Sequence, residues 1–218
     1  MYSFEFERLI RDAALSKARA WDCLAGYLCR AMEEVVRGML NPPPVDEDRN
    51  KIAVEVAIAA EVLHVAQKEL QRLSEKIRDE PDIDSALSRA LGFPKKPLTL
   101  AFEQWILRLV VRHCHVHYRP WLDDTALREL HRFQGALPPA DLMEKAMREC
   151  LARLEVTQRA VLVLYNVGSV LTVHNVTFRD IAAILGWGES GQAAEKAQRL
   201  SERGKSRIKR ILAHYGYT

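Results

Sequence analysis

Apolar residues recur every three or four positions along almost the whole chain, whereas the alternation that is typical of β-strands is scarce. A representative series runs through Trp21, Leu24, Leu28, Met32, Val35 and Met39. Residues with this spacing share one face of an α-helix, so each such series predicts a helix with one apolar stripe. We therefore expect an all-α fold in which helices pack through these stripes.

Prolines and changes in pattern divide the chain into predicted helices. We expect helices at about residues 5–15, 21–39, 49–77, 83–91, 99–118, 140–154, 157–166 and 178–185, followed by a long C-terminal helix. The proline-bounded segment 120–139 is mixed in character and is the expected linker between two helical domains, residues 1–119 and residues 140–218. Residues 52–66 are apolar on nearly every side of their helix, so we expect that segment to be buried.

Length and composition exclude several classes of protein. The chain has 218 residues, of which 48% are hydrophobic and 28% are charged, as in an ordinary soluble globular protein. Its four cysteines lack C-x-x-C spacing, which disfavours a disulfide framework and favours a reducing compartment. No charge-free stretch reaches the roughly 20 residues that span a bilayer. We expect a cytoplasmic protein without a membrane partner.

The basic residues are concentrated at the C-terminal end. The net charge of the chain is only +3, which by itself does not indicate a nucleic-acid partner. From Ser190 to Thr218, however, seven Lys or Arg face two Glu, a local charge of +5. This position of the charge points to an anionic partner of the last predicted helix.

The segment from Thr177 to Gly186 has the features of a short capped helix that ends in a tight turn. Thr177 can cap the helix, Asp180 follows three residues later in the first turn, and Gly186 permits a left-handed stop.

The next predicted helix carries its cations on one face. Lys196, Arg199, Arg203, Arg207 and Arg210 fall within an arc of about 80° around its axis. A neighbouring face carries Ala197, Leu200, Gly204, Ile208 and Ile211. This arrangement is typical of a helix-turn-helix that presents its second helix to duplex DNA. The alternative is that the cations form the solvated side of a C-terminal helix.

Two sets of motifs resemble a known family. Region four of the sigma-70 family is resembled by two segments of the C-terminal half. They are Leu151-Ala-Arg-Leu-Glu-Val-Thr-Gln-Arg-Ala-Val-Leu-Val-Leu-Tyr165 and the segment from Thr177 to Gly186. Residues 9–15 with Trp21, Leu24 and Tyr27, and later residues 102–112, are similar to region two of its extracytoplasmic-function subfamily. The resemblance implies a sigma factor that binds core RNA polymerase and directs it to particular promoters, without catalytic residues, cofactor or metal.

The resemblance also implies which residues meet the partners. The residues implied to contact promoter DNA are Arg179, Gln192, Lys196, Arg199, Arg203, Lys205, Arg207 and Arg210 in region four, with Arg108, Arg112 and Arg119 near the end of region two. The residues implied to contact the polymerase are Glu55, Glu61 and His64. An anti-sigma protein is a further candidate partner.

Two other functions and one other site stay open at this point. The chain is alternatively a stand-alone helix-turn-helix regulator whose N-terminal half senses a ligand or dimerises, or a helical enzyme or adaptor. His113 and His117 lie four residues apart on one helix face, as zinc ligands often do. A zinc site needs further ligands that no nearby Cys or His cluster supplies, so we expect no metal and assign these histidines a structural role or a DNA contact.

Overall fold

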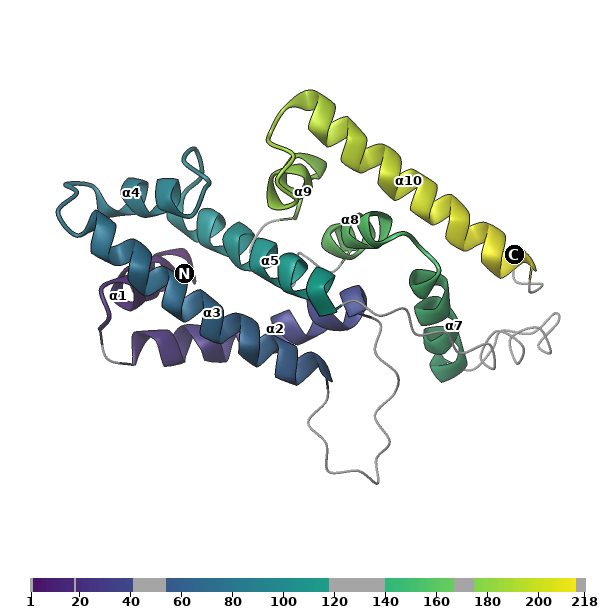
Figure 1. The fold of residues 1–218 in the computed structure, drawn as a ribbon, viewed down its shortest axis with the longest axis horizontal. Helices are drawn as coiled ribbons and strands as arrows, with labels where there is room; N and C mark the ends of the chain where they lie inside the picture. Colours follow the sequence, from purple (N-terminus) through teal and green to yellow (C-terminus); the bar gives the residue numbers. More distant parts are fainter. Residues whose placement is uncertain (1, 18, 41–53, 118–139, 167–174, 215–218) are drawn as a thin grey trace, which may run out of the picture.

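The computed structural model describes residues 2–17, 19–40, 54–117, 140–166 and 175–214, and every regular element in these ranges is an α-helix (Figure 1). The helices are α1 (Tyr2–Ala14), α2 (Ala20–Leu40), α3 (Val54–Ile77), α4 (Ile83–Ala90), α5 (Leu98–His117), α7 (Ala140–Ala152), α8 (Val156–Asn166), α9 (Phe178–Ile184) and α10 (Gly191–His214). The all-α prediction is confirmed, and the expected helices differ from these by only a few residues at their described ends. None of the described helices combines the length and apolar character needed to cross a bilayer.

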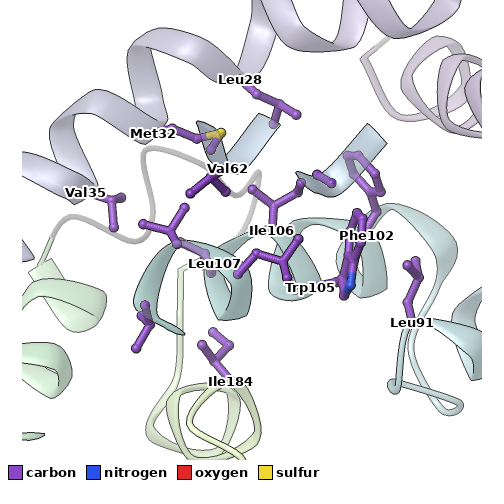
Figure 2. Packing of buried hydrophobic residues seen from close by; sticks show 14 of the residues in the cluster. Leu28, Met32, Val35, Val62, Leu91, Phe102, Trp105, Ile106, Leu107 and Ile184 are labelled. Carbon is purple, nitrogen blue, oxygen red and sulfur yellow. The ribbon is translucent and has the colours of Figure 1, made fainter. Parts of the chain in front are cut away.

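The first core forms where α1, α2, α3 and α5 pack against one another. Leu28 and Met32 of α2 meet Val62 of α3 and Ile106 of α5 in a buried cluster (Figure 2). Phe102 of α5 adds aromatic contacts, because its ring centre lies 5.7 Å from that of Trp105. Residues 98–111 of α5 are buried or half-buried on every side of the helix, so it is the central helix of this half.

The expected burial of residues 52–66 is wrong for one side of α3. Ile58, Ala59 and Val62 are buried, but the opposite side of the helix is exposed. The exposed residues are Ala57, Ala60, Glu61, His64 and Val65. The prediction failed because α3 lies on the outside of the bundle and packs only through the face toward its neighbours. Exposing small alanine side chains costs little, so apolar composition alone did not require burial.

Helix α8 is the centre of the C-terminal half, and two glycines allow other helices to approach it closely. A Cβ atom added at Gly38 of α2 would lie 3.0 Å from Cγ1 of Val163. A Cβ atom added at Gly204 of α10 would lie 2.7 Å from Cδ1 of Leu162. Both distances are shorter than ordinary van der Waals contact, so a larger residue at either position would force the facing side chain or the helices to shift.

A fully buried guanidinium joins α8 to the ends of two other helices. Arg159 donates a hydrogen bond from Nη1 to the carbonyl oxygen of Met39, at 3.0 Å, and another from Nη2 to the carbonyl oxygen of Leu151. These carbonyls lie in the last turns of α2 and α7, where helix carbonyls lack intrahelical partners. Arg159 therefore gives a donor to two carbonyls near helix ends, one of which, that of Leu151, also accepts the Leu154 amide at 3.1 Å.

The hydrophobic core continues from the N-terminal half into the C-terminal half. Ile181 and Ile184 of α9 belong to the same buried cluster as the residues of α5, and Figure 2 shows Ile184 on the side of α5 opposite α2. The expected linker, residues 120–139, lies outside the described residues. The division into two domains stays a prediction, but the described helices of the two segments pack together rather than standing apart.

Candidate nucleic-acid interface

Residues at the helix ends determine the geometry of the turn between α9 and α10. Thr177 and Asp180 form a capping box: Thr177 Oγ1 accepts a hydrogen bond from the Asp180 amide at 3.2 Å, and Asp180 Oδ2 accepts one from the Thr177 amide at 3.0 Å. Gly186 ends α9 with a φ of 77°, which favours glycine. Ser190 Oγ then accepts the Ala193 amide at 3.2 Å and begins α10. The expected roles of Thr177 and Gly186 are confirmed.

Helix α10 packs through a narrow stripe of small and apolar residues. Ala193, Ala197, Ser201 and Gly204 are buried, and Leu200, Ile208 and Ile211 are half-buried. This stripe faces α8 and α9, the helices that α10 contacts most extensively. Because the stripe is narrow, much of the helix circumference is left for solvent or a partner. Figure 1 accordingly shows α10 along one edge of the molecule.

The remaining circumference of α10 is basic and mostly exposed. Of the predicted DNA-contacting residues on α10, Gln192, Lys196, Arg199, Arg203, Lys205 and Arg210 are exposed, and Arg207 is half-buried. Arg179 is also exposed but lies on α9. Within the part of the chain that the structure describes, Arg203, Arg207 and Arg210 form no ion pair. The structure therefore brings the predicted C-terminal cations, except Arg179, together on one accessible helix.

Three of these cations have neighbours that orient them. Lys196 Nζ lies 4.2 Å from the centre of the Trp187 ring, and Lys205 Nζ lies 4.9 Å from that of Tyr165. Such cation–π contacts restrain a lysine without neutralising its charge. Arg199 Nη2 lies 3.2 Å from Glu195 Oε2 in an exposed pair. Arg199 is thus the cation on this face whose charge is partly balanced within its own helix.

A buried carboxylate fixes α9 to the N-terminal half. Asp180 Oδ1 accepts hydrogen bonds from Lys96 Nζ and from Gln104 Nε2, both at 2.8 Å. Burial raises the pKa of Asp180, but the hydrogen bonds from Lys96, Thr177 and Gln104 outweigh it, and the pKa lies below its ordinary value. The first turn of α9 is therefore held by Gln104 of α5 and by Lys96 in the turn that precedes α5.

Arg108 fixes the other end of α9. Its Nη2 donates a hydrogen bond to the carbonyl oxygen of Ala183 at 3.0 Å, and its guanidinium carbon lies 4.2 Å from the centre of the Phe93 ring. Burial, and secondly the nearby charge of Arg112, lower the pKa of Arg108. We predicted Arg108 as a DNA contact, and in the structure it is instead bonded to α9. Arg112 is exposed, and Arg119 lies outside the described residues.

The three predicted polymerase contacts lie in different surroundings on α3. Glu55 is buried, and its Oε1 accepts a hydrogen bond from Arg37 Nε at 3.1 Å, so its carboxylate is not presented to solvent. Glu61 and His64 are exposed. Glu61 Oε2 lies 2.8 Å from His113 Nε2, which ties α3 to α5. Only Glu61 and His64 are therefore placed at the surface.

The histidine segment of α5 holds no metal ligand set in the described part of the chain. No group of three or more His, Cys, Asp or Glu side chains is placed there to hold a metal ion. His113 contacts Glu61, and Cys114 is buried, which raises the pKa of its thiol to about 12. The side chain of His117 is not among the described ones.

The contacts that position α9 were not predicted from the sequence. Lys96 was assigned to a loop and Gln104 to the middle of a helix, and each lies more than seventy residues from Asp180. No local pattern indicates a pairing across such a separation. The one available signal was Asp180 itself, which was interpreted only as a residue of the helix N-terminus.

Comparisons with protein-family models, with curated proteins and with solved structures find no match to this chain. The function is therefore inferred from the site itself.

Proposed function

We propose that this chain is a transcription initiation protein of the sigma-factor type, which binds promoter DNA through α9 and α10 and core RNA polymerase through its N-terminal helices. The observation that carries the proposal is the accessible basic face of α10, on a helix joined to α9 by a short capped turn. The family resemblance of the motifs supports the assignment to promoters rather than to DNA in general.

The dimensions of α10 suit a major groove. The groove of B-DNA is about 12 Å wide, and an α-helix with its side chains is about 10–12 Å across. In helix-turn-helix proteins the first turns of the second helix contact base edges. Gln192, Lys196 and Arg199 are exposed in those turns, so we assign them to bases. Arg203, Arg207 and Arg210 lie further along and are assigned to phosphates.

The test of the DNA interface is the salt dependence of binding. We expect Arg203→Ala and Arg207→Ala each to weaken binding of duplex DNA and to reduce the slope of log K against log salt by about 0.9 for each phosphate that is no longer neutralised. Fluorescence anisotropy over a salt series measures both quantities. Arg30→Ala, an exposed arginine of α2, is the matched control. Unchanged affinity and slope in both α10 variants would contradict the interface.

The proposed polymerase contact uses the exposed side of α3. Glu61 and His64 lie there, and reversing a charge at the rim of an interface slows association. We expect Glu61→Lys to reduce co-purification of the full chain with core RNA polymerase. Glu75→Lys, an exposed position on the same helix, is the matched control and should leave binding unchanged.

A stand-alone DNA-binding regulator is the second candidate, and two observations favour it. Glu55 is buried against Arg37, which removes one of the expected polymerase contacts. Helix α9 is also bonded to the N-terminal half through Asp180 and Arg108, an arrangement suited to a half that controls DNA binding. A full chain that binds duplex DNA but does not co-purify with core polymerase would select this candidate.

A further inference from the structure

A cavity of about 350 Å³ lies between α3, the turn after α4, and α5. Four cations line it: Arg72 and Lys76 come from α3, and Arg108 and Arg112 from α5. One carboxylate, Glu69, lies on its wall. The cavity is separate from the basic face of α10, because none of its lining residues belongs to that helix.

The cations of this cavity are not neutralised by the protein as far as the structure describes it. None of the four forms an ion pair with a described carboxylate, although many other described cations do, such as Arg37 with Glu34 and Glu55. Nε of Arg108 is buried and has no hydrogen-bond partner within the same ranges. A buried donor without a partner is costly, and like charges placed together repel. An anion in the cavity would relieve the repulsion among the four cations.

The position of Arg108 is determined by its surroundings. Its guanidinium lies against the Phe93 ring and bonds the carbonyl of Ala183. Gly92 has a φ of 87°, and a Cβ atom there would lie 2.8 Å from Nη1 of Arg108. The guanidinium is therefore held in one place by a turn that accommodates it, as a binding group must be.

The cavity is also partly apolar. Leu91, Trp105 and Leu109 line it and are themselves buried, so they form walls rather than a mobile surface. Guanidinium groups recognise phosphate oxygens through paired hydrogen bonds, and apolar walls recognise an organic group. We propose that this cavity binds a small phosphorylated organic molecule, whose phosphate meets Arg72, Lys76, Arg108 and Arg112 and whose organic part contacts the apolar wall.

The form of the site favours a small molecule over a DNA backbone. Its volume lies within the usual range for small-molecule sites, about 300–1,000 Å³. Phosphates of duplex DNA lie along one continuous strand, whereas here cations from two helices border a single hollow with apolar walls. The inference does not depend on the proposed function, because the cavity contains neither the cations of α10 nor Glu61 and His64 of α3.

The test is calorimetric titration of the full chain with pyrophosphate, with adenosine monophosphate and with adenosine. We expect the two phosphorylated probes to bind with one-to-one stoichiometry and adenosine not to bind. Arg72→Gln with Lys76→Gln should weaken both phosphorylated probes by about tenfold or more. Both residues are exposed on α3 and have no described ion pair, so the fold should tolerate the change.

The matched control is Arg203→Gln with Arg207→Gln, which removes the same charge from α10. We expect this pair to bind the phosphorylated probes as the wild type does and to lose affinity for duplex DNA. Equal loss of probe affinity in both double variants would indicate diffuse attraction and overturn the site. No binding of either phosphorylated probe at millimolar concentration would also overturn it. If Arg72→Gln with Lys76→Gln binds the phosphorylated probes as the wild type does but loses affinity for duplex DNA, these cations contact the DNA backbone. That result would also overturn the small-molecule site.

Discussion

Asp180 performs two structural roles with one carboxylate. Its Oδ2 accepts hydrogen bonds from the amide and from Oγ1 of Thr177, at 3.0 and 2.6 Å, and so begins α9. Its Oδ1 accepts hydrogen bonds from Lys96 and Gln104 and so fixes the same helix to α5. The charged form has all of these partners, and this explains why its pKa is lowered despite burial.

We predict that Asp180→Asn lowers the free energy of unfolding by about 1.5–3 kcal/mol near neutral pH, because hydrogen bonds to a charged group are removed. The folded pKa lies below the ordinary value of 3.8. The stabilisation by the carboxylate is therefore fully present above that value and is lost as pH falls through the folded pKa. Urea denaturation over a pH series should show the gap to wild type narrowing below pH 3.8. Asp79→Asn, at an exposed position, should show no comparable gap.

The cysteines should differ strongly in reactivity, because the thiolate is the reactive form. Cys23 is exposed, whereas burial raises the pKa of Cys114 to about 12 and that of Cys150 to about 11. We predict that iodoacetamide at about pH 8 modifies Cys23 first, and modifies Cys114 and Cys150 only after unfolding. Mass spectrometry of peptides over a time course measures the order. Early modification of either buried thiol in the folded protein would contradict the packing around it.

At the scale of single helices, the neighbours of each cation on α10 should determine its effect on DNA binding. Arg199 is partly balanced by Glu195, whereas Arg203 has no ion pair in the described chain. We predict that Arg203→Ala weakens duplex binding more than Arg199→Ala does, because the charge of Arg203 is fully available to a phosphate. The double variant Arg199→Ala with Glu195→Ala should bind more tightly than Arg199→Ala alone, since it also removes the carboxylate that Arg199 had balanced. Anisotropy at fixed salt measures all three variants.

Arg159 connects three helices, so its replacement should affect all of them. We predict that Arg159→Met lowers the free energy of unfolding by about 2–4 kcal/mol, because the carbonyls of Met39 and Leu151 lose a buried donor. Arg159→Lys should recover only part of the stability, since one ammonium lacks the fork that reaches two helix ends. Chemical denaturation measures both variants. Arg30→Met, at an exposed position of α2, is the control and should change stability little.

At the scale of the whole molecule, the continuous core predicts joint unfolding of the two halves. Ile181 and Ile184 of α9 are buried in the same cluster as Phe102 and Leu107 of α5. We predict that the slowest amides of α5 and α9 exchange hydrogen with similar opening free energies in native-state experiments. An opening free energy of α9 that is about 2 kcal/mol lower than that of α5 would contradict this prediction. It would show that the two halves separate before the whole chain unfolds.

Most helices could be predicted from the sequence, because their signals are local. The spacing of Leu24, Leu28 and Met32 indicated α2, and Thr177 with Gly186 indicated the ends of α9. The error at α3 had a physical cause as well. Residues 52–66 have the composition of a buried segment, but whether a helix lies inside or outside a bundle depends on its neighbours. The exposed side of α3 shows that composition alone did not decide this.

The candidate sites could be predicted only in part. The cations of α10 follow a helical period, so their shared face was predictable, and the structure presents them together. The cavity was not predictable, because Arg72 and Arg112 come from different helices and meet through tertiary packing. Arg108 shows the limit most clearly: the family resemblance implied a DNA contact near the end of region two, whereas its bond to Ala183 depends on the fold.

Arg108 lines the basic cavity and also a second one of about 310 Å³, which it shares with Ala183 and Gly186 at the turn after α9. One side chain therefore connects the basic cavity with the end of α9, because its Nη2 bonds the Ala183 carbonyl. Thermodynamic linkage then applies in both directions. An anion bound by Arg108 also holds its guanidinium against the Ala183 carbonyl, so anion binding and the docking of α9 strengthen each other by the same factor. A cooperative response between the cavity and the DNA-binding helices thus requires no more than this one shared side chain.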